Sequence, residues 1–246
     1  MVQLSVNVNK VATLRNARGR GEPDLIKAVD VCLAAGVRGI TVHPRADARH
    51  ITHADVHQLA ARLQAPDAAG VELNIEGDPE PGWLALVQQV RPQQATLVPV
   101  RPGEVTSEGG WPVDLDRAHL SGIVQDLKAR GIRVSVFVDP VPSAVRLAGE
   151  LGADRVELFT EPFANGFAEQ MPEDELLAPY RAAAELAHEL GLGVNAGHDL
   201  NLDNLGCFLR VPHVDEVSIG HALISRALFV GLERVVGEYL ALTTAA

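Results

Sequence analysis

Lysine and cysteine are scarce in this chain of 246 residues. Only three of its 21 basic residues are lysine (Lys10, Lys27 and Lys128), so an enzyme that forms a Schiff base through its own lysine has few candidates here. The two cysteines, Cys32 and Cys207, lie far apart in helix-like segments and match no metal-ligand spacing. They indicate buried thiols in a protein of a reducing compartment.

Long apolar runs and a targeting segment are missing as well. The N-terminal residues MVQLSVNVNK do not combine a charged stretch with an apolar one, as a secretory signal would. No apolar run approaches the roughly 20 residues that cross a bilayer. We therefore expect a cytoplasmic protein that has no membrane partner.

Positive charge is in deficit, because 21 Lys and Arg residues face 32 Asp and Glu residues and give a net charge of −11. Binding of nucleic acid depends on a basic face that neutralises phosphates, so the charge balance argues against a nucleic-acid partner. A small anionic substrate remains possible, since one pocket needs only a few local cations.

The apolar residues, 47% of the chain, follow two alternating patterns. Short β-branched segments with a period of two predict strands, and amphipathic segments between them predict helices. The predicted strands are residues 4–8, 39–43, 71–76, 95–99, 133–139, 155–160, 192–197 and 216–220. The predicted helices are residues 23–36, 51–63, 82–90, 116–131, 143–152 (with Ser143 as the N-cap), 173–191, 201–211 and 225–242.

Strands that alternate with helices indicate an α/β protein with a parallel sheet. Eight such units in about 250 residues fit a (β/α)8 TIM barrel. An open doubly wound sheet is the alternative, and the missing G-x-G-x-x-G turn after the first strand argues against it. No linker divides the chain, so we expect a single barrel domain over residues 1–246. Two long loops, 100–113 and 160–172, would lie on the catalytic face.

The active site of such a barrel is built from the carboxyl ends of its strands and the loops that follow them. Imidazole and carboxylate groups gather at those positions, and they are the groups of an enzyme that moves protons. The polar residues at the predicted strand ends are Asn7, Asn9, Lys10, His43, Arg45, Asn74, Glu76, Asp139, Glu157, Thr160, Asn195, His198 and His221.

Two further features indicate phosphate binding. The segments after the first two strands carry arginines that could grip phosphate, namely Arg15, Arg18, Arg20, Arg45 and Arg49. Glycines end the seventh and eighth strands, in NAGHD and SIGHA, where backbone N–H groups can hold a phosphate. One anion site on each side of the mouth predicts two phosphorylated substrate groups.

A pair of histidines, His53 and His57, has the spacing of metal ligands on one helix. Neither an HExxH motif nor a nearby cysteine cluster accompanies it. We therefore assign both to a solvated helix face and expect no metal site.

Several sequence blocks together resemble the pyridoxine 5'-phosphate synthases, barrel enzymes that close the pyridine ring of vitamin B6. The blocks are ATLRNARG, ITVHPRADARHIT, EVTSEGG, VNAGHDL and SIGHALISRA, and they span nearly the whole chain. The resemblance implies condensation of 3-amino-2-oxopropyl phosphate with 1-deoxy-D-xylulose 5-phosphate, which yields pyridoxine 5'-phosphate, phosphate and water. It also implies an enzyme without metal or organic cofactor that assembles as a homo-octamer.

The resemblance assigns roles to individual positions. It implies acid/base catalysis by His43 and Glu76, proton donation by His198 and transition-state stabilisation by Glu157. For the pentulose phosphate site it implies Arg45, His50 and Thr106. For the site of the amine substrate it implies Asn7, Arg18, Gly220 and His221.

The chain departs from the family pattern at a few positions. Asn9 and Lys10 stand where an Asp-His pair that contacts the pentulose is common, and Asp199 stands where glycine is common beside a phosphate. Lys10 could replace the histidine as a cation and donor. Glu161 replaces another usual glycine. These changes affect the expected pentulose contacts more than the reaction.

Two other hypotheses remain at this point. One is a different phosphate-handling barrel enzyme, an aldolase or epimerase with Lys10 as a Schiff-base nucleophile. The other is a binding or scaffold protein without catalysis, for which the histidines and glutamates at the strand ends would be dispensable.

Overall fold

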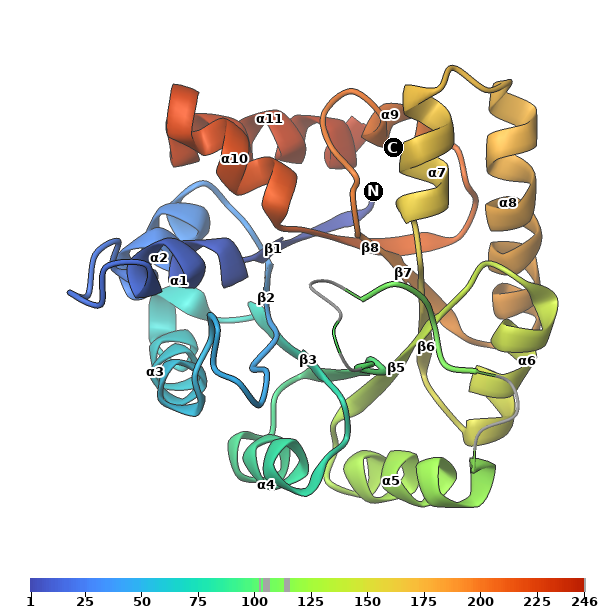
Figure 1. The fold of residues 1–246 in the computed structure, drawn as a ribbon, viewed down its shortest axis with the longest axis horizontal. Coiled ribbons are helices and arrows are strands. Elements are labelled where there is room, and N and C mark those ends of the chain that lie inside the picture. The colour runs from blue at the N-terminus through green and yellow to red at the C-terminus, as the bar shows by residue number, and fades with distance from the viewer. Residues whose placement is uncertain (102, 104–106, 113–115, 246) are drawn as a thin grey trace.

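Eight parallel strands close into a barrel in sequence order, and β8 pairs with β1 (Figure 1). This computed structural model describes residues 1–101, 103, 107–112 and 116–245. The prediction of a (β/α)8 barrel is confirmed. The strands are β1 (Gln3–Asn7), β2 (Gly39–Val42), β3 (Glu72–Gly77), β4 (Gln94–Leu97), β5 (Arg133–Val138), β6 (Arg155–Leu158), β7 (Gly193–Ala196) and β8 (Val214–Ile219).

Helices surround the barrel on its outside (Figure 1). Within the described residues, none of them is long and apolar enough to cross a membrane. The helices are α1 (Asn9–Asn16), α2 (Leu25–Ala34), α3 (His53–Leu63), α4 (Pro81–Val90), α5 (Arg117–Ala129), α6 (Pro142–Leu151), α7 (Glu161–Ala168), α8 (Glu173–Glu189), α9 (Leu205–Phe208), α10 (His221–Val230) and α11 (Leu232–Ala245), with the 3-10 turn η1 (Pro66–Ala68).

Local chemistry sets several helix boundaries. Thr52 and Asp55 form a reciprocal capping box at the start of α3, which satisfies backbone N–H groups that have no partner within the helix. Helix α6 begins at Pro142, so the prediction of Ser143 as its N-cap was wrong. Proline suits the first helical position, because its ring fixes φ and no N–H is needed there.

Four predicted segments differ from the structure. The loop expected at 160–172 contains α7, because Phe163 packs against the rings of Tyr180 and Phe208. The helix expected over 225–242 divides into α10 and α11 at Gly231, whose φ of 91° cannot continue a helix. The helix expected over 201–211 shortens to α9, and the first part of the arginine-rich segment 13–23 belongs to α1.

The apolar core lies between the sheet and the helices. Outward residues of the strands such as Ile40 and Ile75 are fully buried there. Inside the barrel most side chains are polar, with Phe137 beside His198 as an apolar exception. Ser5 and Thr41 share a hydrogen bond of 2.7 Å between their hydroxyl oxygens. Since residues alternate between the two faces of a strand, the inward polar positions continue up to the carboxyl ends. The mouth of the barrel is therefore mostly polar.

Candidate active site

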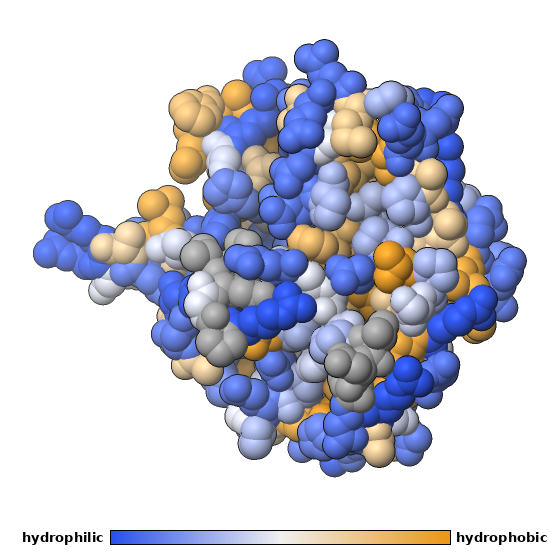
Figure 2. Space-filling view, turned by 45° about the vertical axis from the view of Figure 1, so that its right-hand side comes forward, coloured by the Kyte–Doolittle hydropathy of each residue, from blue (hydrophilic) through white to orange (hydrophobic). Residues whose placement is uncertain are grey.

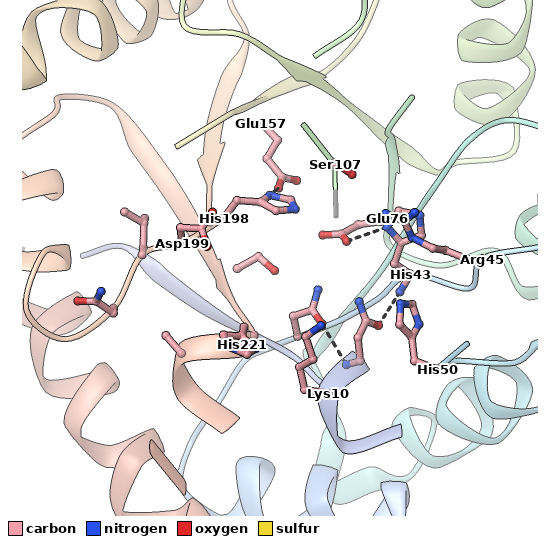
Figure 3. A pocket seen from close by; sticks show the side chains of 18 residues that line it. Lys10, His43, Arg45, His50, Glu76, Ser107, Glu157, His198, Asp199 and His221 are labelled. Atoms are coloured by element: carbon pink, nitrogen blue, oxygen red, sulfur yellow. Dashed lines mark hydrogen bonds and ion pairs between the residues drawn. The ribbon is translucent and has the colours of Figure 1, made fainter. Parts of the chain in front are cut away.

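A cavity of about 270 Å³ opens at the carboxyl ends of the strands (Figure 3). Residues of β1, β3, β6 and β8, and of the segments that follow β1, β2, β4, β7 and β8, meet around it. The lining residues are Asn7, Asn9, Lys10, His43, Arg45, His50, Glu76, Ser107, Glu157, Gly197, His198, Asp199, Leu200, Asn201, Ser218, Gly220, His221 and Ala222.

All of the predicted site residues except two line this cavity. Arg18 is exposed on the segment between α1 and α2, which projects from the body of the molecule (Figures 1 and 2). It does not reach the cavity of its own chain. Thr106 lies outside the described residues, and its neighbour Ser107 lines the cavity.

Gly197, the predicted glycine at the end of the seventh strand, lines the cavity, and five further lining residues were not predicted. A signal existed for two of them, because Ser218 lies in SIGHA and Ser107 lies in EVTSEGG. The loop after β7 brings Leu200 and Asn201 to the cavity, and the start of α10 brings Ala222 there. No local sequence pattern indicates these three positions.

Some polar strand ends serve the scaffold instead. Asn74 accepts a hydrogen bond from Thr96 inside the barrel at 3.0 Å, and Asp139 accepts one from the backbone of Gly110 at 3.1 Å. Asn195 accepts a hydrogen bond from Arg155 at 2.7 Å. These groups are satisfied within the protein, and they are not among the residues that line the cavity.

His43 and Glu76 form one acid/base pair. Nδ1 of His43 lies 3.6 Å from Oε2 of Glu76, and both side chains are almost completely buried. The backbone N–H of His43 donates to Asn9 Oδ1 at 2.9 Å, which holds the histidine against the start of α1. The indole N–H of Trp83 donates to the carbonyl of Glu76 at 2.9 Å and fixes its backbone. The pair is therefore preorganised.

Glu157 and His198 form a second pair, in which Nδ1 of His198 lies 3.7 Å from Oε1 of Glu157. Both carboxyl oxygens of Glu157 are buried without a hydrogen-bond partner among the described residues. Burial, and then the negative charges of Glu76 and Glu216, raise the pKa of Glu157 well above its usual value. Burial lowers the pKa of His198. At neutral pH these shifts favour a protonated Glu157 beside a neutral His198.

Three basic residue types, Lys10, Arg45 and His50, lie at one side of the mouth (Figure 3). Burial, and then the charges of His43, Arg45 and Lys10, lower the pKa of His50 to about 4. Its Nδ1 accepts a hydrogen bond from the Ile51 N–H at 2.9 Å. His50 is therefore neutral at pH 7 with its proton on Nε2, and Lys10 and Arg45 supply the positive charge.

The other arginines of the predicted phosphate segments have different positions. Arg15 pairs with both carboxylate oxygens of Asp55, at 2.5 and 2.9 Å, and joins α1 to α3. Arg49 pairs with Asp47 on the surface. Arg45 is thus the arginine of these segments that lines the cavity in the described chain.

Glycines shape the opposite side of the mouth. A Cβ atom at Gly197 would lie 2.3 Å from the Ser218 carbonyl oxygen, so only glycine allows this close approach of β7 and β8. Gly220 directly precedes α10, and the N-terminal N–H groups of that helix suit an anion. Helix α9, in contrast, begins eight residues after Gly197, so the seventh strand ends in a turn and not in a helix start.

The histidines His53 and His57 are both exposed on α3, away from the cavity. In the part of the chain that the structure describes, no three His, Cys, Asp or Glu side chains are arranged to hold a metal ion.

These features define a (β/α)8-barrel enzyme with acid/base groups enclosed in a polar mouth. The family model of pyridoxal phosphate biosynthesis protein PdxJ matches residues 4–245, and the chain belongs to this family. A relative from Bacteroides thetaiotaomicron, named pyridoxine 5'-phosphate synthase, is 51% identical over 97% of this chain and 98% of that protein. A relative of the same name from Christiangramia forsetii is 48% identical over 98% of this chain and 99% of that protein.

Two solved structures share the fold at low sequence identity. Thiamine phosphate pyrophosphorylase from Pyrococcus furiosus has a TM-score of 0.64 at 14% identity, and it covers 99% of this chain and 96% of its own. Phosphoribosylanthranilate isomerase from Thermotoga maritima has a TM-score of 0.61 at 13% identity over the whole of both chains. The family relatives confirm that the chain is an enzyme of vitamin B6 biosynthesis, as the sequence blocks predict.

Proposed function

We propose that the cavity condenses 3-amino-2-oxopropyl phosphate with 1-deoxy-D-xylulose 5-phosphate to pyridoxine 5'-phosphate, phosphate and water. The proposal rests on one observation. The two acid/base pairs, His43–Glu76 and Glu157–His198, lie between two sides of the cavity that are suited to bind anions. Lys10 and Arg45 lie on one side, and the glycine turn and the start of α10 lie on the other. The name of the relatives at about half identity supports the same reaction.

The substrates themselves account for the imine chemistry. The amine of one substrate attacks the ketone of the other and loses water, so an enzyme lysine is not required. The later loss of phosphate, the dehydration and the ring closure each need a proton to be given or taken at a fixed position. Groups held around one rigid mouth can supply these protons in turn.

The roles of the two pairs follow from their surroundings. His43 and Glu76 exchange protons with the reacting carbons and hydroxyl groups, because they lie within reach of each other and of the cavity. We assign the resting proton of this pair to Glu157, because burial raises its pKa. His198, 3.7 Å away and partly exposed to the cavity, passes this proton on to a leaving group. Up to that transfer Glu157 stabilises developing negative charge as a neutral acid, and after it Glu157 is a carboxylate.

The binding groups divide between the two substrates. Lys10, Arg45, His50 and the undescribed Thr106 bind the pentulose phosphate. Asn7, Gly220 and His221 bind the amine substrate. Arg18 would contact a substrate only if its segment moved or if it entered the cavity of another subunit. Asn9 acts through the backbone of His43, to which it is hydrogen bonded. Asp199 contacts the phosphate by its backbone, since its carboxylate would repel it.

One experiment tests the reaction directly. Purified protein is supplied with both phosphates, and the pyridine chromophore and the released phosphate are measured together. We expect both to appear in a fixed ratio. Folded protein that yields neither would overturn the proposal.

A barrel aldolase or epimerase is the second candidate, because Lys10 lies in the cavity and could attack a carbonyl group. Borohydride reduction in the presence of a keto-phosphate separates the two candidates. A covalent adduct at Lys10 would favour the aldolase, and product without adduct favours the synthase.

The remaining expectations concern assembly and location. We propose a homo-octamer of single-domain subunits (1–246) in the cytoplasm, without nucleic-acid or membrane partners. Leu228 and Phe229 on α10 are 68% and 88% exposed, which is apolar surface that self-association would bury. Light scattering would measure the mass, and a Phe229→Glu variant should form smaller species.

A further inference from the structure

The turn that carries His198 has an unfavourable backbone conformation. Residues 197–200 form a β-turn closed by a hydrogen bond of 3.2 Å from the Leu200 N–H to the Gly197 carbonyl. His198 and Asp199 are its central residues. Asp199 has a φ of 63°, the left-handed region that favours glycine at this position of a turn. Other contacts must hold the turn in place.

Two buried side chains supply these contacts. Thr160, fully buried just after β6, donates its hydroxyl hydrogen to the carbonyl of His198. Asn204, 2% exposed before α9, donates from Nδ2 to the carbonyl of Asp199 at 3.2 Å. Its Oδ1 accepts from the Asn201 N–H at 2.8 Å. The peptide groups on both sides of the Asp199 α-carbon are therefore fixed.

The fixed carbonyls determine where the rest of the turn points. In a trans peptide the C=O and N–H groups point in opposite directions. Because the His198 carbonyl faces Thr160, the Asp199 N–H points away from that residue, and no described residue accepts a hydrogen bond from it. Figure 3 shows the His198 ring beside Glu157, with Asp199 further out along the same segment.

We propose that Thr160 and Asn204 are positioning residues, which hold turn 197–200 so that the His198 imidazole meets the substrate and Glu157 in a productive geometry. Neither side chain lines the cavity, so both act through the turn. The inference rests on the proposed role of His198 in the condensation. Small displacements of a catalytic group reduce rates strongly, which gives these remote contacts a kinetic effect.

The test uses Thr160→Val and Asn204→Asp, each of which removes one donor to the turn while the side chain keeps nearly the same shape. Thr160→Ser keeps the hydroxyl group and should keep the activity of the wild type. Thr243→Val is the matched control, because Thr243 is also buried and donates to a backbone carbonyl, that of Leu240 at 3.3 Å, in α11 away from the cavity.

We expect kcat to fall about tenfold or more in Thr160→Val and Asn204→Asp, with a smaller change in either KM. Thr160→Ser and Thr243→Val should retain wild-type kcat. The imidazole NMR signals of His198 should shift in Thr160→Val and stay in place in Thr243→Val.

Unchanged His198 signals together with an unchanged kcat in both donor-deleting variants would overturn the positioning role. If Thr160→Val does not fold, Asn204→Asp decides by the same two readouts. A wild-type enzyme that forms no product would instead contradict the proposed function, and the NMR comparison would still decide whether Thr160 orients His198.

Discussion

The Nδ1 atom of His43 lies 3.6 Å from Oε2 of Glu76, and the two side chains are only 6% and 3% exposed. A histidine and a carboxylate at this distance can exchange a proton when a substrate group lies between them. The hydrogen bonds of Asn9 and Trp83 to the two backbones keep the pair in place without occupying its reactive atoms.

Glu76→Gln should lower kcat by about a hundredfold or more, because the amide keeps the shape of the side chain and cannot exchange a proton. Steady-state product formation measures the change. Circular dichroism and the melting temperature should stay close to wild type, which distinguishes lost chemistry from lost structure. A variant with near wild-type kcat would remove Glu76 from the mechanism.

Glu157→Gln should change the pH dependence of stability. The folded protein raises the pKa of Glu157, so the folded state holds this proton while the unfolded chain loses it above its ordinary pKa. Wild-type stability therefore falls as pH rises from the unfolded pKa toward the folded one. The melting temperature of Glu157→Gln relative to wild type should rise over that range.

Glu216, whose pKa burial also raises, is present in both proteins, so the difference between them at each pH reports Glu157 together with its electrostatic effect on Glu76 and Glu216. A melting-temperature difference that stays constant from acid to neutral pH would contradict a protonated Glu157.

His50→Gln should bind the pentulose phosphate within about fivefold of wild type, because a neutral imidazole is replaced by another neutral hydrogen-bonding group. Lys10→Ala should raise the KM for this substrate about tenfold, since it removes a positive charge from the side of the mouth where His50 lies. The KM of the amine substrate serves as the internal control. A larger effect from His50→Gln than from Lys10→Ala would mean that a charged His50 binds the phosphate.

Asp55→Asn should lower the free energy of unfolding by about 3 kcal/mol, because it leaves Arg15 without its buried partner. Burial opposes ionisation of Asp55, yet the hydrogen bonds from Arg15 and Thr52 outweigh it and lower the pKa of Asp55. The difference from wild type should therefore be full at neutral pH and shrink as pH falls through the folded pKa.

Urea denaturation measures this loss. Asp47→Asn is its control, because Asp47 pairs with Arg49 at the surface and should change stability by less than about 1 kcal/mol. Equal losses in the two variants would contradict the structural role of the Arg15 pair.

Much of the site could be predicted because parallel strands bring their carboxyl ends to one mouth. Alternation along a strand places His43 and Glu76 on the inner face, and the order of the strands then brings them together. Glu157 follows by the same rule, whereas His198 lies in the turn after β7 and reaches Glu157 through the course of that turn. The geometry of a closed barrel thus converts sequence periodicity into proximity.

Packing between helices could not be predicted from the periodicity of the sequence. The local sequence gives no reason to expect different positions for Arg15 and Arg45. Arg15 stays outside the cavity because α1 lies against Asp55 of α3, whereas Arg45 lines the cavity. The segment that forms α7 contains proline, asparagine and glycine, which indicate a loop. Burial of Phe163 against distant aromatic rings outweighs that local preference.

The polar interior of the barrel also affects how the chain can close on itself. Ile40 and Val42 face the helices, while Thr41 faces the barrel axis. A slip of one residue in strand pairing would exchange the two sets, so that hydroxyl and amide groups would enter the apolar layer and lose their partners. The side chains that form the mouth belong to the same inward rows that make a one-residue shift of register unfavourable. Selection for chemistry at the top of each strand and selection for a unique strand alignment therefore act on one set of positions.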